Sequence, residues 1–238
     1  MNGTYLKNRV ERLSGGENDF INGSSPAAGM VDYATIIKPG EAIGTFWGYE
    51  WTGLDEKGHD TYTDVDGNQM IDGGDRKVIG KANPDFTLGW NNSLSYKNWD
   101  LSMQFTSQLG FKILNEPRAY YENNSHAYNR LKSVEEAPYG GQYTLSSSQP
   151  QTMVSYYLEN GNFLKLTNLT IGYNFPFKNN KYIKNVRAYL SGDNLFCITG
   201  YSGLDPELSN PYPTYAGIDN RDKYPSIRSF TFGLNLTF

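Results

Sequence analysis

One stretch of this 238-residue sequence has side chains of the kind and spacing that bind a metal ion. Oxygen ligands stand at positions 1, 3, 5, 7, 9 and 12 of a twelve-residue loop and belong to Asp64, Asp66, Asn68, Met70 (through its main-chain carbonyl), Asp72 and Asp75. Calcium prefers six to eight oxygen ligands, and alternate positions of a tight loop direct them toward one point. We therefore predict a calcium site here, with calcium as the cofactor.

The loop departs from the EF-hand pattern at two positions, so its affinity for calcium is expected to be low. Gln69 stands where an EF-hand has a turn-forming glycine, and Asp75 stands where a longer glutamate binds through both oxygens. Ile71 is expected to anchor the loop to the body beneath it. An acidic turn without a metal is the alternative interpretation.

No other group of residues predicts catalysis, and we expect that the protein is not an enzyme. Asp205 and Glu207 flank a proline and suggest the carboxylate pair of a glycosidase, but acids in a turn usually pair with a nearby Lys or Arg. His59 and His126 lack a second ligand at metal-binding spacing, and no nucleophile motif is present. Seven loop tyrosines are candidates for stacking on sugar rings or for packing on one another: Tyr120, Tyr121, Tyr128, Tyr139, Tyr143, Tyr212 and Tyr215.

The composition favours a strand-rich protein. A net charge of -4 without any cluster of Lys or Arg argues against nucleic acid as a partner. Aromatic residues make up 15% of the chain, there are 25 glycines, and the mean hydropathy of -0.61 is too low for a bundle of membrane helices. The first five residues show no secretory signal, and the single Cys197 excludes an intrachain disulfide.

Apolar and polar residues alternate along six segments that we expect to be strands: 43–54, 86–96, 99–111, 168–175, 186–198 and 230–238. A strand with lipid on one face and water on the other has to alternate in this way, and about ten residues can cross a bilayer at a tilt. Lys97-Asn98 is expected to be a hairpin turn, and Pro176 is expected to end its strand because it has no N–H to donate.

Alternation alone equally fits a water-soluble β-sandwich, in which one face of each strand packs on a core. Three features favour the membrane: few charges on the polar face, a regular change between short and long connections, and aromatic residues at strand ends. Trp47, Tyr49, Trp51, Trp90, Tyr96, Trp99, Tyr173 and Phe175 are expected to form these aromatic girdles. A soluble β-sandwich that binds calcium and carbohydrate remains the alternative.

Short motifs also follow one another in a particular order along nearly the whole chain. They are Asn8-Arg9-Val10, Gly44-Thr45-Phe46-Trp47-Gly48-Tyr49, the acidic loop Asp64 to Asp75, Val78-Ile79-Gly80-Lys81-Ala82-Asn83-Pro84-Asp85-Phe86, Asn160-Gly161-Asn162-Phe163-Leu164-Lys165-Leu166, Asn194-Leu195-Phe196, Gly200-Tyr201-Ser202-Gly203-Leu204-Asp205-Pro206-Glu207, Tyr224-Pro225 and Phe238. Their order and spacing resemble the C-terminal barrel portion of SusC/RagA-type TonB-linked (TonB-dependent) outer-membrane receptors of Bacteroidetes.

The resemblance implies an all-β fold of antiparallel, up-and-down strands that form part of a transmembrane β-barrel, about six of roughly twenty-two strands, with long extracellular loops. Residues 1–238 would then be the C-terminal part of the barrel, with the plug domain and the signal peptide absent. Six strands alone leave open sheet edges, which are too unfavourable to lie in hydrocarbon. We therefore expect a fragment of a longer receptor, with a non-functional truncated gene product as a further alternative.

The resemblance also implies a function and partners. The chain would belong to a cell-outer-membrane transporter that imports glycans or other nutrients, with an oligosaccharide or peptide as its ligand. Its partners would be a SusD-like surface lipoprotein, outer-membrane lipid, and TonB, the last only through the missing N-terminal region. Phe238, with apolar residues at every second position before it, is expected to act as the assembly signal, read by pairing of an extended strand.

Overall fold

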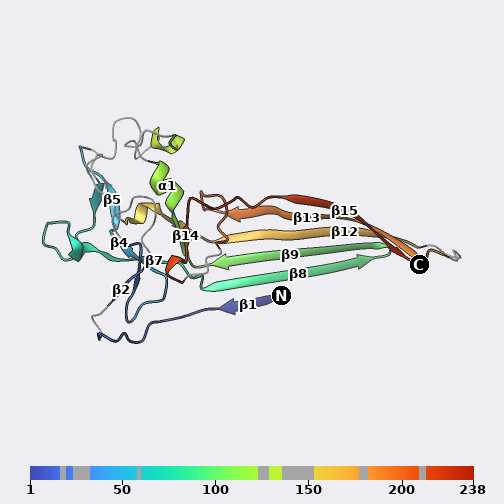
Figure 1. Ribbon diagram of the computed structural model, residues 1–238, viewed down its shortest axis with the longest axis horizontal. Coiled ribbons are helices and arrows are strands. Elements are labelled where there is room, and N and C mark those ends of the chain that lie inside the picture. Colours follow the sequence, from blue (N-terminus) through green and yellow to red (C-terminus); the bar gives the residue numbers. More distant parts are fainter. Residues whose placement is uncertain are drawn as a thin grey trace.

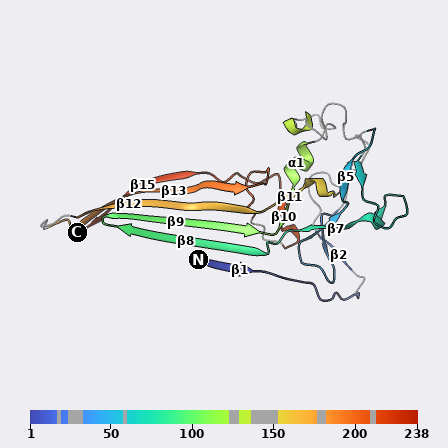
Figure 2. The ribbon, with the colours of Figure 1, turned by 180° about the vertical axis from the view of Figure 1, so that it is seen from behind.

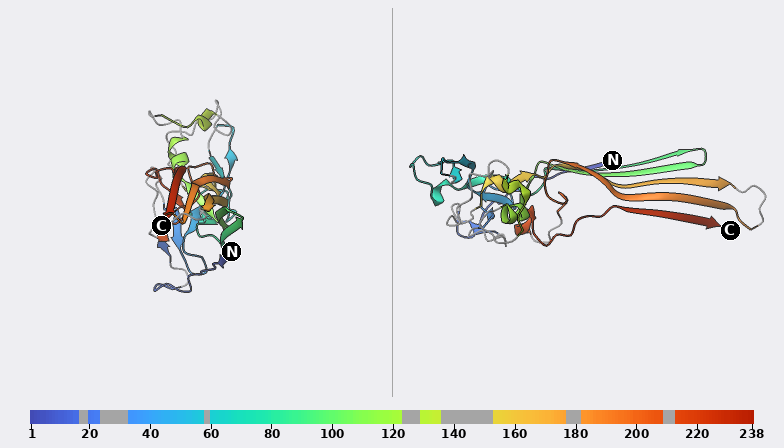
Figure 3. Two further views of the ribbon diagram at one scale, coloured as in Figure 1. Left: turned by 90° about the vertical axis from the view of Figure 1, so that its right-hand side faces the viewer. Right: turned by 90° about the horizontal axis from the view of Figure 1, so that it is seen from above.

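The computed structural model describes residues 1–16, 20–23, 33–57, 60–122, 129–135, 153–176, 182–208 and 213–238. The fold is almost entirely β-structure, as predicted. A long, slender sheet forms one end of the molecule, and a body of shorter strands and turns, the loop body, forms the other (Figures 1 and 2). Two further views show that the long sheet is curved and that the loop body lies entirely at one of its ends (Figure 3).

The long sheet has six antiparallel strands in the order β1-β8-β9-β12-β13-β15. These strands are β1 (Asn2–Tyr5), β8 (Phe86–Tyr96), β9 (Trp99–Leu109), β12 (Phe163–Pro176), β13 (Asn185–Thr199) and β15 (Ser229–Thr237). Neighbours in the sheet follow one another in the chain, which is the predicted up-and-down arrangement. β1 and β15 lie at the two edges, so the sheet in the described part of the chain is open.

The register places the alternating apolar residues of neighbouring strands on one face. Trp90 pairs with Phe105 and Tyr96 with Trp99 across the β8–β9 hairpin. The turn between these two strands is the predicted Lys97-Asn98, with Lys97 at φ 55° in the left-handed region that a tight hairpin requires.

A bulge in β12 preserves this face over a longer strand than the alternation predicted. Leu166 pairs with Phe105 and Asn168 pairs with Gln104, so Thr167 is an extra residue in β12. Because side chains alternate with a period of two, this extra residue changes the parity of every position after it. The bulge leaves Thr167 without a partner in β9, so the residues after it keep their alternation relative to β9. Leu166 and Leu169 therefore lie on the same face.

Two predicted strands were wrong in their extent. Segment 43–54 is not a strand of the long sheet: it contains β4 (Thr45–Gly48) and β5 (Trp51–Leu54), which belong to two different small sheets of the loop body. Between them, Tyr49 exchanges main-chain hydrogen bonds with Met153 and Ser155, each of 2.9 Å. The sixth strand of the long sheet is instead β1.

The strand predicted over 99–111 ends at Leu109. Gly110 has φ 83°, a conformation that favours glycine, and the chain turns there into β10 (Lys112–Asn115). Phe111, which was expected to continue the apolar row, is buried in a small core cluster with Ile113, Phe163 and Tyr201. Phe111 therefore packs inside the loop body and does not extend the apolar row on the outer face of the sheet.

The described parts of the long connections fold into the loop body, and the Lys97-Asn98 turn lies at the opposite end of the sheet, as predicted (Figure 1). The loop body contains a sheet of β2 (Ile21–Asn22), β3 (Thr35–Ile37), β4 and β7 (Lys77–Lys81), a sheet of β11 (Leu158–Asn160), β10 and β14 (Ile218–Asp219), and the pair β5–β6 (Asp60–Tyr62). Its helical turns are α1 (Glu116–Tyr121), η1 (Gly73–Asp75), η2 (Lys132–Glu135), η3 (Ser155–Tyr157) and η4 (Pro213–Tyr215). The β10–β14 pair is parallel, an exception to the antiparallel prediction.

The main hydrophobic core lies in the loop body. Its buried members are Ala34, Phe46, Ala82, Leu114, Ala119, Met153, Val154, Tyr157, Leu158 and Ile218. They come from segments far apart in sequence, so the described parts of the long connections pack around a core of their own. No helix in the described part of the chain is long and apolar enough to span a membrane.

Candidate functional site

The outer face of the long sheet is apolar and uncovered. Ile171 is 43% exposed and Phe232 69% exposed, although both are large apolar side chains in regular strands. Other exposed residues on this face include Phe86, Trp90, Leu94, Leu190, Phe196, Ile198, Phe230, Leu234 and Leu236. In a β-sandwich these rows would pack against a second sheet. No described strand or helix covers them, so the sandwich alternative is not favoured.

Aromatic side chains gather near the short-turn end of this face. Trp99 packs on Tyr173 with ring centroids 4.8 Å apart, and Tyr173 packs on Phe175 at 4.7 Å. Tyr96 lies beside them and is 70% exposed. Such a row is typical of the aromatic girdle at a membrane–water interface.

Three other aromatic residues expected in a girdle lie in the loop body instead. Tyr49 packs on Tyr62 with ring centroids 5.2 Å apart, and Trp51 packs on Tyr156 at 4.7 Å. Trp47, on β4, lies under the ammonium group of Lys38. Their clustering in sequence thus reflects packing within the loop body.

The opposite face of the sheet is polar, and its charged groups accept or donate hydrogen bonds. Arg187 donates to Asp100 through Nε at 2.9 Å, and Asn174 donates to the same carboxylate at 3.2 Å. Further along the same face, Asp193 accepts hydrogen bonds from Asn168 at 2.7 Å and from Ser229 at 2.9 Å. Hydrogen-bonded groups of this kind suit a water-filled interior.

The two carboxylates considered for glycoside hydrolysis belong to an ion-pair cluster where the sheet meets the loop body. Lys165, on the polar face of β12, donates to Asp205 and Glu207, each at 3.0 Å. Burial by itself raises the pKa of Asp205, but hydrogen bonds from Ser226, the Glu207 N–H and Lys165 hold it below its ordinary value. The cluster fastens the segment after β13 to the sheet.

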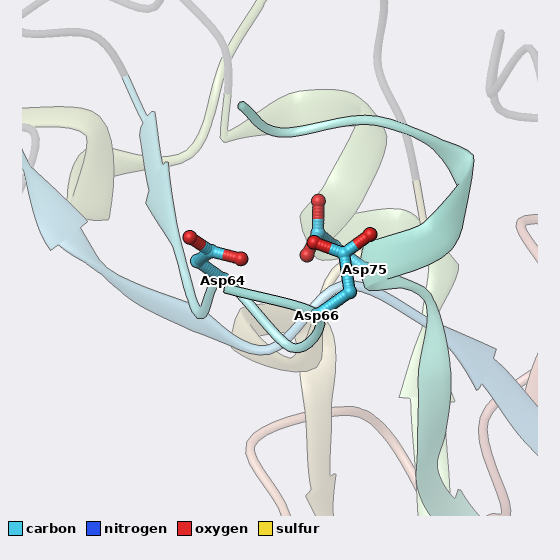
Figure 4. Close-up of side chains that lie close together, drawn as sticks. All are labelled: Asp64, Asp66 and Asp75. Atoms are coloured by element: carbon cyan, nitrogen blue, oxygen red, sulfur yellow. The ribbon is translucent and has the colours of Figure 1, made fainter. Parts of the chain in front are cut away.

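The acidic loop brings three of its predicted ligands together. Carboxylate oxygens of Asp64, Asp66 and Asp75 all lie within 4.8 Å of one another (Figure 4). The turn that achieves this needs a left-handed residue at position 6, and Gln69 takes that conformation with φ 65° although it is not glycine. Asp64 stabilises the turn by accepting the N–H groups of Gly67 at 2.7 Å and Gln69 at 2.9 Å.

Asp75 is the buried member of the three. Its two oxygens accept the N–H groups of Val65 at 2.7 Å and Asp72 at 2.9 Å, and these hydrogen bonds hold the pKa of Asp75 below its ordinary value. The carboxylate is therefore ionised and fixed in place. Each carboxylate oxygen has a second lone pair with which to bind a hard cation, so these three residues fit calcium.

The other predicted ligands have different local roles. The Asp72 carboxylate caps η1 by accepting the Gly74 N–H at 2.7 Å. Asn68 accepts the Met70 N–H at 2.7 Å and donates to Asp66 at 3.0 Å, and the Met70 side chain is exposed. Ile71 is 46% exposed, so the prediction that it anchors the loop was wrong. The capping box of Asp72 and Asp75 orders this part of the loop instead.

Other candidate residues are dispersed. Tyr120 and Tyr121 contact each other with ring centroids 4.9 Å apart, while Tyr215 is partly exposed in η4. Phe238 follows β15 and is 73% exposed. His59, His126, Tyr128, Tyr139, Tyr143 and Tyr212 lie outside the described residues. Sequence reasoning missed a cavity in the loop body, because segments distant in sequence line it.

An apolar outer face, a polar inner face and long connections folded at one end define a class of protein. The long sheet is a piece of membrane-spanning β-sheet of the transporter-barrel type. This class matches the fold prediction.

Comparison with known proteins narrows the class to a family. No protein-family model matches the chain. It is 34% identical over 98% of its length to TonB-dependent receptor P3 of Formosa agariphila and 30% identical over 99% to TonB-dependent receptor SusC of Bacteroides thetaiotaomicron. It covers 26% and 24% of these two relatives, about a quarter of their length. The chain therefore belongs with the SusC/RagA-type TonB-dependent receptors, and the predicted resemblance is confirmed.

Solved structures support the fold. The structure of the RagAB peptide transporter matches 99% of the chain and 26% of its own chain, with a TM-score of 0.76 and 23% identity. The RagAB peptide importer in its open-open state matches the same shares with a TM-score of 0.74 and 22% identity. At this level of identity the likeness concerns the arrangement of strands.

Proposed function

We propose that the chain forms part of the wall and the external loops of a TonB-dependent transporter that imports nutrients across the outer membrane. The supporting observation is the uncovered apolar face, with Ile171 and Phe232 exposed in regular strands. Apolar surface of this extent is unfavourable in water and favourable in lipid. The loop body would then project to the outside of the cell, and the polar face would line the interior.

The proposed cargo is a glycan or a peptide, and the proposed partner is a SusD-like surface lipoprotein. The likeness to the RagAB peptide transporter supports a peptide cargo, and the likeness to SusC and RagAB supports a partner of the SusD type. The loop body offers a folded external surface on which such a partner could rest. Contact with TonB is proposed for regions of the longer relatives that lie outside the quarter matched by this chain.

Fractionation of the source cells tests the membrane assignment. An antibody against the loop body is expected to detect the protein in the outer-membrane fraction, extracted by detergent but not by high salt. High salt releases proteins that are bound to the membrane surface by charge. Strands that face lipid leave the membrane only when detergent takes the place of the lipid around them. Recovery of the protein as a soluble monomer without detergent would contradict the proposal.

We also propose that Asp64, Asp66 and Asp75 form the centre of a calcium site on the external side of the membrane. Their oxygens lie within 4.8 Å of one another, and Asp75 is held ionised by main-chain hydrogen bonds. Asn68, the Met70 carbonyl and Asp72 complete the proposed set of ligands. Extracellular calcium is abundant enough to occupy sites whose dissociation constant is about 10⁻⁴ to 10⁻³ M.

Phe238 is proposed to be the assembly signal. It follows a strand in which Phe230, Phe232, Leu234 and Leu236 all lie on the outer face. Removal of Phe238 is expected to lower the amount of protein in the outer membrane several-fold, because strand pairing with the assembly machinery would be weakened. Thr237→Ala, a change of the residue before it, serves as the control. Equal outer-membrane levels of the two variants and the unchanged protein would exclude the signal.

A further inference from the structure

A cavity of about 620 Å³ lies in the loop body, between α1 and the segments that follow β13 and β14. This volume is in the range of small-molecule binding sites. None of the residues that line it belongs to the acidic loop or to the lipid-facing sheet. Its apolar wall is formed by Pro117, Tyr121, Leu131 and Leu204.

The two arginines of the cavity wall already have carboxylate partners. Arg118 forms ion pairs with Glu122 and with Glu159, the latter at 3.2 Å. Arg221 lies 3.4 Å from Glu116. An anionic ligand would therefore compete with carboxylates that are already in place, and breaking a buried ion pair is unfavourable.

The other two charged groups of the wall, Lys223 and Asp219, act on each other. Burial raises the pKa of Asp219 and lowers the pKa of Lys223, and the charge of each group counteracts the shift of the other. The Lys223 ammonium group also donates to the main-chain oxygens of Asp205 at 2.5 Å and of Glu207 at 3.5 Å. A neutral ligand can thus enter the cavity without displacing an ion pair.

The wall also has hydrogen-bonding groups that the described residues do not satisfy. Asp219 is buried, and its Oδ2 accepts a hydrogen bond of 2.6 Å from the Tyr201 hydroxyl, but its Oδ1 has no hydrogen-bond partner in the described part of the chain. The side chains of Ser133 and Asn220 likewise form no hydrogen bond with a described residue. A buried acceptor without a donor is unfavourable, so an O–H group of a ligand that reaches Oδ1 is stabilising.

A ring of hydroxyl groups matches this wall. Each hydroxyl both donates and accepts, so a sugar can pair with the acceptor of Asp219 and with the side chains of Ser133 and Asn220. A sugar ring also has a face of C–H groups that packs on an aromatic ring. Tyr121 offers such a ring, since it is 36% exposed and contacts Tyr120 edge-on, at an interplanar angle of 84°.

We propose that this cavity binds a neutral sugar ring, with the C–H face of the ring against Tyr121 and one hydroxyl donating to Oδ1 of Asp219. The inference rests on the proposed function in one respect, the external position of the loop body, which exposes the cavity to glycans outside the cell. It deepens that function by locating a contact for a glycan and by favouring neutral sugars over acidic and basic ones.

Sugar probes of matched shape and different charge test the proposal on the complete chain, in micelles of a detergent without a sugar head group. The neutral probes are the methyl glycosides of glucose, galactose and mannose, and each has an amino-sugar and a uronic-acid counterpart with the same ring. N-acetylleucinamide is a neutral probe without hydroxyl groups.

Isothermal titration is expected to detect saturable binding of at least one neutral glycoside. Its two charged counterparts and N-acetylleucinamide are expected to bind roughly tenfold more weakly or less, because the charged probes have to displace an ion pair and the amide lacks the hydroxyl groups. Absence of saturable binding by every neutral glycoside, or binding of another probe as tight as that of the best glycoside, would overturn the proposal.

Two pairs of variants locate the site. Tyr121→Ala removes the stacking surface and is expected to weaken binding of the neutral glycoside about fivefold, whereas Tyr224→Ala, at an exposed tyrosine outside the wall, is expected to preserve it. Asp219→Ala removes the acceptor and is expected to weaken binding about fivefold, and Asp222→Ala, at an exposed residue outside the wall, is its control. Equal affinities within either pair would refute the assigned contact.

Leu204→Trp keeps the proposal testable if the variants of Tyr121 and Asp219 do not fold, because the Leu204 side chain is largely exposed. The larger side chain is expected to obstruct the cavity and to abolish binding. Met70→Trp, at an exposed residue of the acidic loop, is the control and is expected to preserve binding. Unchanged binding by Leu204→Trp would also overturn the proposal. Failure of these binding tests leaves the membrane fractionation result unaffected, so the two proposals are judged separately.

Discussion

At the scale of single residues, the acidic loop depends on the short distances between carboxylates. Three negative charges within 4.8 Å repel one another unless hydrogen bonds or a cation offset the repulsion. Main-chain N–H groups provide part of this compensation at Asp64 and Asp75. A bound calcium ion would provide the rest.

Asp66→Asn is therefore expected to weaken calcium binding about tenfold, because it removes one charge from the ligand set. Calcium competition against terbium luminescence measures the affinity. Glu56→Gln is the matched control, since it makes the same charge change at an exposed residue outside the three-carboxylate cluster. The calcium proposal fails if both variants lose the same affinity or if the unchanged protein does not bind calcium at millimolar concentration.

Neighbouring residues of one strand are also expected to differ sharply in their tolerance of charge. Phe232 lies on the lipid-facing side of β15 and Thr231 on the polar side. Phe232→Arg is expected to destabilise the protein in a bilayer by about 2–4 kcal/mol, and Thr231→Arg by much less. Urea titration in lipid vesicles measures the difference. Equal losses for the two variants would contradict the assignment of the faces.

At the scale of elements, the bulge at Thr167 shows how β12 keeps its apolar residues on one side. Leu164 and Leu166 precede the bulge and Leu169 and Ile171 follow it, yet all pair with outer-face positions of β9. Without Thr167, simple alternation would place the same four residues on one face. Thr167 therefore makes the bulge necessary. Without Thr167 the strand would need no bulge to keep its apolar residues on one face.

Deletion of Thr167 is therefore expected to leave assembly in the outer membrane nearly unchanged. Deletion of Thr170, a residue of the regular ladder, is expected to reduce assembly several-fold, because it moves one half of the apolar row to the polar face. Membrane levels and resistance to unfolding in detergent distinguish the two deletions. A larger loss of assembly on deletion of Thr167 than on deletion of Thr170 would contradict this account and would mean that the bulge has a role of its own.

At the scale of the whole molecule, the two ends are built on different principles. The loop body has buried clusters around Phe46 and Phe111, whereas the long sheet has its large apolar residues on an exposed face. The first can be stable in water, and the second requires lipid or detergent. The molecule is thus divided between an aqueous part and a membrane part.

This division predicts which residues can be reached from outside the cell. In a Cys197→Ser background, Met70→Cys in the acidic loop is expected to react with a membrane-impermeant maleimide on intact cells. Tyr182→Cys, near the short turn between β12 and β13, is expected to react only after the cells are opened. Both native side chains are well exposed, at 64% and 73%, so burial does not explain a difference. The opposite labelling pattern would reverse the proposed orientation.

The sequence by itself determined the chemistry of the two faces and the approach of Asp64, Asp66 and Asp75. Both are local properties: side chains of a strand alternate with a period of two, and the three acids lie in one short loop. Which segments become strands of the long sheet is not a local property. The segment that contains Phe46 and Trp51 alternates like a barrel strand, yet Tyr49 pairs with Met153 and Ser155 about a hundred residues away and draws the segment into the loop body. Tertiary structure likewise decided the burial of Phe111, the exposure of Ile71 and the formation of the cavity around Asp219. Burial depends on which distant segments pack together, and a sequence pattern does not indicate those partners.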